Sequence, residues 1–476
     1  MALLAAESDG PAFPVSTVSK DGLAEWCGAQ PPEIGAWIRT TGFKAHPGEF
    51  SLLPDGSGGL FGVLLGLSAD QFSMWDAGDL ARKLPDGIYA LAGELDAKRA
   101  MGLSLGWLLG AYEFNRYKEP KSDADQSIGV RLRCPENCDR ELLENSATAS
   151  FLVRDLINTP AGDMGPAALA EAAKELATTH DAEFSVIVGD DLLAANYPAI
   201  HAVGRAAAEA PRLVDLIWGE PDAPKVTLVG KGVCFDTGGL DLKPSGGMKL
   251  MKKDMGGAAH VLGLAQMIMA AKIPVRLRVL IPAVENSVSA NAIRPLDVVP
   301  TRNGKTVEIG NTDAEGRVIL ADVLAEASSE EPDFIVDYAT LTGAARVALG
   351  TELPALFCND ENFANAILAA GVTTQDQLWR LPLWHGYKKS IEGKTADLTN
   401  APESGFGGAI TAALFLQEFL AGKSTDKNAQ KITAAIPWAH IDLMAWNLSS
   451  KPGRPEGGEA MSMRALFSAI AQLYSR

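Results

Sequence analysis

A regular alternation of apolar, strand-like runs with helical patterns, starting near residue 183, constrains the fold of this chain more than any other feature. The apolar runs lie at 184–188, 213–218, 226–229, 275–281 and 334–338. This rhythm is typical of an α/β fold with a mixed, mostly parallel sheet flanked by helices. Because ligands in such folds gather at the carboxyl ends of the strands, we expect the polar clusters of the chain to follow the strands.

The residues before this region predict a smaller α/β domain. Apolar runs at 50–53 and 60–67 flank a segment rich in Pro, Asp, Ser and Gly, which favours a β-hairpin. Residues 96–112 show a helical pattern. The part from 14 to about 145 has no cluster of acids or histidines and no glycine-rich phosphate loop, so we expect it to shape or assemble the protein.

Two helices are predicted between these regions. One covers 139–158 and ends before Pro160, which biases Thr159 away from helical geometry; the next begins near Pro166. With 476 residues, two unequal domains are the natural division. We therefore expect an N-terminal α/β domain over 1–138, a helical linker over 139–180 and a larger domain over 181–476.

Charge and composition exclude some classes of partner. The chain has 42 Lys and Arg against 59 Asp and Glu, a net charge of −17, and no basic run, so nucleic acid is not an expected partner. The apolar stretch 256–271 is shorter than the roughly 20 residues of a membrane span. No basic segment precedes the short apolar run at the N-terminus, which argues against a secretory signal.

The five cysteines are odd in number and mostly scattered, which favours free thiols in a reducing, cytoplasmic compartment. Cys134 and Cys138 have a spacing that could hold a metal. No second Cys or His pair lies nearby, so we interpret them as two loop thiols.

The first polar cluster follows the run 226–229 and places Lys231, Asp236 and Lys243 among six glycines. Glycines let the backbone turn tightly and approach a ligand. The pattern is not a phosphate loop of the GxxxxGK[ST] kind. Taken alone, the cluster fits a salt-bridged surface turn equally well.

The second cluster contains Asp254, just before a helix that begins near Gly256. An isolated acid at that position is most simply a helix cap or a partner of the helix dipole. Lys252 and Lys253 are interpreted as solvated or paired, not as site residues.

The third cluster, NTDAEGR at 311–317, places Asp313 and Glu315 in the turn that enters a helix, with Arg317 beside them. Two such carboxylates can converge on a cation, and the arginine offers a neighbouring anion site. An EF-hand is the rival interpretation, but its twelfth position holds Asp322 instead of Glu, and the preceding segment reads as a hairpin.

Only six histidines occur and none forms an HExxH pair, so a metal site here must consist mainly of carboxylates. Such a cluster can hold two divalent ions that activate water and polarise a carbonyl or phosphoryl oxygen. Lys231 could join it only as a neutral amine, because a nearby dication would depress its pKa.

The segments VGKGVCFDTGGLDLKPSGGM, KKDMGGAA and NTDAEGR, in this order, resemble the leucyl aminopeptidase family, the two-metal cytosolic aminopeptidases. The resemblance continues through RDLINTP, YATLTGA, WRLPL, ADLTN, GGAITAALFLQEF and PWAHID, and covers roughly residues 145–476. The N-terminal region matches weakly, chiefly at YEFNRYK from Tyr112. The domain at 181–476 is then expected to be the metallopeptidase catalytic domain.

The resemblance implies a role for each site residue. Asp236 and Glu315 would bridge two zinc or manganese ions, Lys231 and Asp254 would complete the tighter site, and Asp313 the more exchangeable one. Lys243 would stabilise the developing oxyanion, and Arg317 would hold a bicarbonate that acts as general base. The expected substrates are peptides with an apolar first residue such as Leu or Met, and the expected assembly is a homohexamer.

By the same resemblance, Met251, Thr340 and Leu341 would line the pocket for the first side chain. The family usually has a small Ala-Gly pair after its WAHxD segment, whereas this chain has Met444-Ala445 followed by Trp446. Met444 could narrow the pocket or merely repack the core. His440 and Trp438 are expected to be packing residues.

Two alternatives stay open from the residues alone. Carboxylate clusters also serve two-metal phosphoesterases, although these do not require a lysine ligand such as Lys231. A peptide-binding or regulatory protein is the other alternative, and the complete ligand set argues against it.

Overall fold

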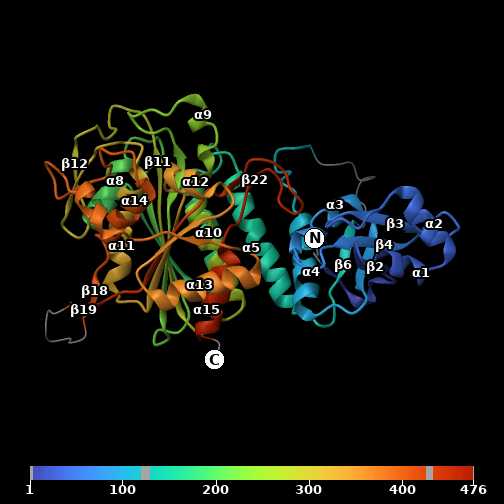
Figure 1. Cartoon of the computed structure of the whole chain (residues 1–476). Coiled ribbons are helices and arrows are strands. Elements are labelled where there is room, and N and C mark those ends of the chain that lie inside the picture. Colours follow the sequence, from blue (N-terminus) through green and yellow to red (C-terminus); the bar gives the residue numbers. More distant parts are fainter. Residues whose placement is uncertain (1–3, 120–128, 425–431, 475–476) are drawn as a thin grey trace. The chain divides into compact units, whose positions relative to one another are not determined.

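The computed structural model describes residues 4–119, 129–424 and 432–474. The chain folds into two compact units, Met1–Phe151 with Ser449–Glu456, and Leu152–Leu448 with Gly457–Arg476. The boundary falls inside helix α5 (Arg140–Asn158). In Figure 1 the first unit is blue to cyan except for its red segment Ser449–Glu456, and the second contains the other elements from green to red.

The first unit is an α/β unit built on a six-stranded sheet of order β1-β6-β5-β2-β4-β3. All neighbouring strands are parallel except β3 and β4, which form the predicted hairpin with Leu52 opposite Val63. The strands are β1 (Leu4–Ala5), β2 (Phe13–Ser19), β3 (Phe50–Pro54), β4 (Leu60–Leu67), β5 (Gly87–Ala92) and β6 (Val130–Arg133). The helices are α1 (Leu23–Gly28), α2 (Pro32–Thr41), α3 (Leu80–Lys83) and α4 (Ala97–Gly110), with short 3-10 turns η1 (Glu7–Asp9) and η2 (Met74–Ala77).

Helix α4 illustrates how this unit is stabilised. The side chain of Asp96 accepts a hydrogen bond from the amide of Arg99 and so caps the helix. Leu103, Trp107 and Leu108 are buried in the core of the unit, as their spacing predicts.

The second unit contains a nine-stranded mixed sheet with the order β16-β15-β20-β14-β9-β11-β8-β7, and β10 pairs with β11 off this path. The central pairs are parallel, whereas β7, β8 and β15 run antiparallel to a neighbour. The strands are β7 (Glu183–Val188), β8 (Arg212–Trp218), β9 (Lys225–Gly230), β10 (Gly232–Asp236), β11 (Arg276–Asn286), β14 (Phe334–Ala339), β15 (Ala355–Cys358), β16 (Trp379–Arg380) and β20 (Trp438–Asp442). The expected mixed, mostly parallel sheet is confirmed.

Helices cover both faces of this sheet (Figure 1). Helices α6, α10, α13 and α15 contact one another on one face, and α8, α11 and α14 form the group on the other. The helices are α6 (Pro166–Thr179), α7 (Asp191–Ala194), α8 (Pro198–Gly204), α9 (Ser245–Met248), α10 (Gly256–Ala270), α11 (Glu315–Ser329), α12 (Gly343–Leu349), α13 (Glu361–Thr374), α14 (Gly408–Gln417) and α15 (Met463–Tyr474). The 3-10 segments are η4 (Met251–Met255) and η5 (His385–Ile391).

Small sheets complete the unit. Strands β12 (Val298–Pro300) and β13 (Thr306–Glu308) form an antiparallel pair where a hairpin was expected, and β17 (Leu398–Thr399) adds a third strand. This geometry confirms that no helix precedes the loop at 311–317, which excludes an EF-hand there. The remaining pairs are β18 (Gly422–Ser424) with β19 (Ile432–Ala435), and β21 (Trp446–Asn447) with β22 (Gly457–Gly458).

Parallel strands end at one edge of the sheet and deliver the polar segments there. Strand β9 ends one residue before Lys231, and β14 ends one residue before Thr340. Asp442 is the last residue of β20. Trp438 and His440 of the same strand are buried and place their ring nitrogens 2.7 and 2.5 Å from the carboxylate of Asp337, so they act as packing residues.

In the described ranges, none of the helices combines the length and apolarity needed to cross a membrane. The five cysteines, all in described segments, are free thiols.

Candidate metal centre

The backbone of Lys231 is fixed between the sheet and helix α10. Its amide donates to the carbonyl of Tyr338 at 3.0 Å, and its carbonyl accepts from the amide of Ala258 at 2.9 Å. The side chain then runs across Gly316, where a Cβ would lie 2.4 Å from Cε of Lys231. The NTDAEGR loop therefore needs glycine at this position so that the lysine can reach the acids.

The ammonium of Lys231 lies between two buried carboxylates. Its Nζ is 2.8 Å from Oδ2 of Asp254 and 3.1 Å from Oε1 of Glu315, and it donates to the carbonyl of Thr340 at 3.1 Å. Burial by itself would lower the pKa of Lys231, but Asp254, Glu315 and Asp236 outweigh it and raise that pKa. In the absence of a metal ion, these neighbours favour the protonated form of Lys231.

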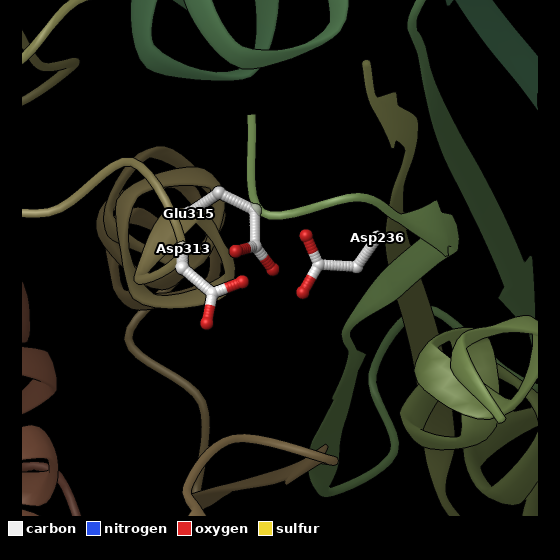
Figure 2. A group of neighbouring side chains, drawn as sticks. All are labelled: Asp236, Asp313 and Glu315. Carbon is white, nitrogen blue, oxygen red and sulfur yellow. The ribbon is translucent and has the colours of Figure 1, made fainter. Parts of the chain in front are cut away.

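Asp236, Asp313 and Glu315 converge from two segments that lie far apart in the sequence (Figure 2). Each offers a carboxylate oxygen such that the three oxygens lie within 4.8 Å of one another. Asp236 ends strand β10, whereas Asp313 and Glu315 come from the entrance of α11. Lys243 extends its Nζ to 2.7 Å from Oδ2 of Asp236 and also contacts Oδ1 of Asp313.

Burial and neighbouring negative charge raise the pKa values of Glu315 and Asp313. Burial is the main cause for Glu315, and repulsion from Asp236 adds to it, so that the pKa of Glu315 rises to about 8. Burial and Asp236 also raise the pKa of Asp313, although Lys243 opposes the shift. The groups of the protein therefore do not stabilise Glu315 in its charged form near neutral pH.

The donor set fits divalent metal ions. Four carboxylates (Asp236, Asp254, Asp313 and Glu315) face two lysines, which leaves an excess of two negative charges at full ionisation. Three of the carboxylate oxygens, Oδ2 of Asp254, Oδ1 of Asp313 and Oε1 of Glu315, are buried and have only a lysine ammonium beside them among the described residues. Buried acceptors with uncompensated charge are the features that a hard divalent cation satisfies.

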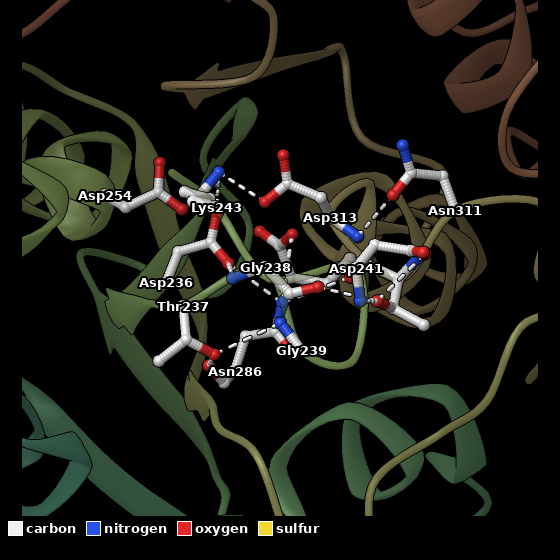
Figure 3. Close-up of polar contacts among 12 residues, drawn as sticks. Asp236, Thr237, Gly238, Gly239, Asp241, Lys243, Asp254, Asn286, Asn311 and Asp313 are labelled. Carbon is white, nitrogen blue, oxygen red and sulfur yellow. Dashed lines mark hydrogen bonds and ion pairs between the residues drawn. The ribbon is translucent and has the colours of Figure 1, made fainter. Parts of the chain in front are cut away.

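A polar network around Asn286, the last residue of β11, holds the carboxylates in place (Figure 3). The Asn286 side-chain amide donates to Oδ1 of Asp236 at 2.8 Å and to the carbonyl of Thr312 at 3.1 Å, and lies 3.5 Å from Oε2 of Glu315. The Asp241 carboxylate accepts from the amide of Thr312 at 2.7 Å, and the Thr312 hydroxyl accepts from the amide of Asp241 at 2.8 Å. These bonds join the glycine-rich loop to the NTDAEGR loop.

Arg317 lies buried beside this cluster. One of its terminal nitrogens donates to the carbonyl of Asn400 at 2.7 Å, while its Nε has no hydrogen-bond partner in the described structure. Burial lowers the pKa of Arg317 to about 10. Its remaining donors are free to bind an anion.

The cluster opens into a cavity of about 690 Å³. Glu315 is buried against Lys231 and does not line this cavity. The other residues predicted for the site all line it: Lys231, Asp236, Lys243, Met251, Asp254, Asp313, Arg317, Thr340 and Leu341. Met444 also lines it, whereas Trp446 faces Lys252, with the lysine Nζ 5.4 Å from its ring centroid.

The interpretation of Lys253 as solvated or paired is wrong. Its side chain is only 5% exposed, lines the cavity and forms no ion pair with any described residue. Burial lowers the pKa of Lys253 to about 8, although Asp254 opposes the shift. Its neighbour Lys252 is paired as expected, through a 2.5 Å bond to the carbonyl of Asn158.

Two further residues of the site were missed. Asn286 could have been suspected because it follows a predicted strand, but that run ends at 281 in the apolar pattern and the observed strand continues five residues further. Asp442 accepts bonds from the amides of Leu341 and Thr342 and from the hydroxyl of Thr342, which orients the loop after β14. Its role depends on a tertiary contact that no local pattern reveals.

Comparisons with known proteins agree with this geometry. The family described as "Cytosol aminopeptidase family, catalytic domain" matches residues 151–467, and "M17 aminopeptidase, N-terminal domain" matches residues 13–128. A probable cytosol aminopeptidase of Leifsonia xyli subsp. xyli is 38% identical, over 98% of this chain and 94% of that protein. One of Syntrophotalea carbinolica is 35% identical, over 92% and 91%.

Solved structures are similar over the whole chain. The cytosol aminopeptidase from Coxiella burnetii has a TM-score of 0.91 and 48% identity, with 98% of each chain covered. The bottromycin maturation enzyme BotP in complex with Mn has a TM-score of 0.86 and 35% identity, with 98% of this chain and all of the other covered. The chain therefore belongs to the cytosol aminopeptidase family, the metal-dependent hydrolases that act as aminopeptidases on peptides.

Proposed function

We propose that this chain removes the N-terminal residue of peptides with two divalent metal ions, Zn or Mn. Asp236 and Glu315 would bridge the two ions, Lys231 and Asp254 would complete one site, and Asp313 the other. When bound, such ions lower the pKa of water and polarise a carbonyl oxygen. The observation that carries the proposal is the convergence of three carboxylates within 4.8 Å, next to a lysine buried against two acids.

Lys243 and Arg317 supply the fixed positive charges in this proposal. The Lys243 ammonium lies at the cavity wall, where it can stabilise negative charge that develops on the substrate oxygen. Arg317 has donors free to hold a bicarbonate that accepts a proton from water. Both residues act without changing their own protonation state.

The same geometry supports cleavage at the first peptide bond. A free α-amine suits a cavity end lined by carboxylates, so peptides with blocked N-termini are expected to be poor substrates. Met251, Thr340 and Leu341 line the cavity and would contact the first side chain. Leu or Met is the family preference, and Met444 adds bulk to that wall.

An assay of amino-acid anilides against phosphate esters, with Mn or Zn added to metal-free protein, tests the reaction class. We expect turnover of leucyl and methionyl anilides only, and its loss in Glu315→Ala. Glu220→Ala, an exposed acid of the same unit, is the matched control. Hydrolysis of the phosphate esters alone would refute the aminopeptidase and favour a phosphoesterase.

The proposal extends to assembly and location. A homohexamer would have a mass of about 300 kDa by light scattering, six times the 50.2 kDa of one chain. A monomeric mass at micromolar concentration would contradict it. A cytoplasmic location rests on the description of the relatives as cytosol aminopeptidases.

A further inference from the structure

Two cationic side chains on the cavity wall have no carboxylate partner. Lys253, in η4, and Arg346, in α12, both line the cavity, and neither forms an ion pair with a described residue. The Arg346 guanidinium donates to Sδ of Met444 at 3.6 Å, which is a weak acceptor. The other lysines of the cavity differ, because Lys231 and Lys243 each contact two carboxylates.

No acid of this wall is available to these cations. Asp442 is the carboxylate of the cavity outside the proposed metal ligands, and it is occupied by two backbone amides and the hydroxyl of Thr342. A lysine that is 95% buried without a counter-ion destabilises the protein unless a bound anion compensates it. The location of Lys253 in a substrate cavity makes the substrate the natural source of that anion.

The neighbours of the two cations indicate the shape of the ligand. Met251, Leu443 and Met444 line the same cavity and offer an apolar surface for an aliphatic stem. Arg346 is exposed and Lys253 is buried, and both line this cavity, so both are available to a carboxylate that enters it. A short aliphatic stem that ends in a carboxylate matches this combination.

We infer that Lys253 and Arg346 form a subsite for a carboxylate of the peptide substrate. The carboxylate has two possible sources, the side chain of an N-terminal Glu or Asp residue, or the free C-terminus of a very short peptide. The inference rests on the proposed function, because it assigns the subsite to the substrate of that reaction. It departs from the family expectation of a purely apolar pocket.

Paired substrates separate the two sources. Glutamyl and leucyl anilides share a leaving group and differ only in the first side chain, whereas Leu-Gly and Leu-Gly-amide differ only in the terminal carboxylate. We define the anilide ratio as kcat/KM for the glutamyl over the leucyl anilide, and the dipeptide ratio as kcat/KM for Leu-Gly over Leu-Gly-amide. In Lys253→Met we expect one of these two ratios to fall by about tenfold or more, as for loss of a hydrogen bond to a charged group. A fall in the anilide ratio assigns the side chain, and a fall in the dipeptide ratio assigns the C-terminus.

Arg346→Gln and Lys249→Met complete the design. Arg346 is exposed, so its substitution tests the subsite with little risk of misfolding, and we expect the same ratio to fall by a smaller factor. Lys249 is an exposed lysine four residues before Lys253 that does not line the cavity, and its replacement should leave both ratios within twofold of wild type. If both ratios in Lys253→Met also stay within twofold, the subsite does not exist.

Equilibrium binding keeps this test separate from turnover. Calorimetric titration of metal-loaded protein with glutamate and with leucine should show glutamate affinity reduced in Lys253→Met relative to leucine affinity. If no anilide is hydrolysed, the proposed function fails, and calorimetric titrations with glutamate, leucine, Leu-Gly and Leu-Gly-amide still decide the subsite. Affinities for glutamate and for Leu-Gly that are the same in wild type and Lys253→Met would overturn the inference.

Discussion

At the scale of single residues, the proposed metal centre would place two opposite requirements on Lys231. Without metal, its neighbours Asp254 and Glu315 raise its pKa and keep it charged. As a metal ligand it must be neutral, and a dication nearby would lower the same pKa. Glu315 would also have to lose a proton to bind a metal ion, because its pKa of about 8 leaves it largely protonated at neutral pH.

Metal binding is therefore expected to release protons. At pH 7, titration of metal-free protein with Mn in buffers of different ionisation enthalpy should give at least one proton released per chain. The release should decrease as the pH rises above about 8, since Glu315 is then ionised before metal arrives. Binding without any proton release at pH 7 would contradict the predicted ligand roles of Lys231 and Glu315.

Asn286 offers a second prediction at this scale. Asn286→Ala removes the donor that orients Asp236 and approaches Glu315, so Mn affinity should fall by about 10- to 100-fold in a calorimetric titration. Asn291→Ala, an exposed loop residue, serves as the control and should bind Mn as wild type does. A purely structural role would lower the melting temperature of Asn286→Ala and leave the Mn affinity unchanged.

Single residues also show where sequence reasoning ends. The ligand candidates stand in three recognisable motifs, so their residue types and spacing indicate them directly. Lys253 occupies one of the same motifs, but its burial follows from tertiary packing, and a lysine in a charged segment most often reaches solvent. The sequence predicts which acids form the candidate metal centre, but not that the neighbouring Lys253 is buried.

At the scale of elements, long periodic segments were predictable and short or polar strands were not. The helix expected at 139–158 is α5 (Arg140–Asn158), and the run 226–229 is β9. Strand β20 has no continuous apolar pattern because His440 and Asp442 are buried within it, and His440 lies against Asp337 of the neighbouring strand β14. Strand β10 has only five residues, from Gly232 to Asp236, and its register with β11 is irregular, so its pairing depends on the finished sheet.

Asp322 links two elements and gives a prediction about pH. Its carboxylate accepts bonds from the amides of Ala199 and Ile200 in α8 and of Arg302, while burial raises its pKa to about 7. A carboxyl group with a raised pKa stabilises the fold most below its unfolded value near 3.8, and this contribution is lost as the pH rises through about 7.

The melting temperature of wild type minus that of Asp322→Asn should therefore fall from pH 5 to pH 7 and stay constant above about 7.5. Both proteins share the other titrating groups, so the difference isolates this one. Asp222→Asn, at an exposed position, should show no such trend. A rise of this signed difference with pH would mean that the pKa of Asp322 is lowered, and would contradict the account.

At the scale of the whole molecule, total charge and local charge differ. The chain carries −17, which made nucleic acid an unexpected partner, yet its cavity is lined by five cations and four carboxylates: Lys231, Lys243, Lys253, Arg317, Arg346, Asp236, Asp254, Asp313 and Asp442. Composition is a sum over the surface, whereas the site depends on which residues the sheet edge brings together. The presence of two unequal α/β units was predictable from the length of 476 residues.

The most direct test of the account is a crystal structure of the protein soaked in Mn, with anomalous scattering used to locate the ions. We predict two peaks among Asp236, Asp254, Asp313 and Glu315, one of them about 2.0–2.3 Å from Nζ of Lys231. A map with no peak in this cluster, or with Lys231 still paired to Asp254 and no ion within bonding distance, would contradict it.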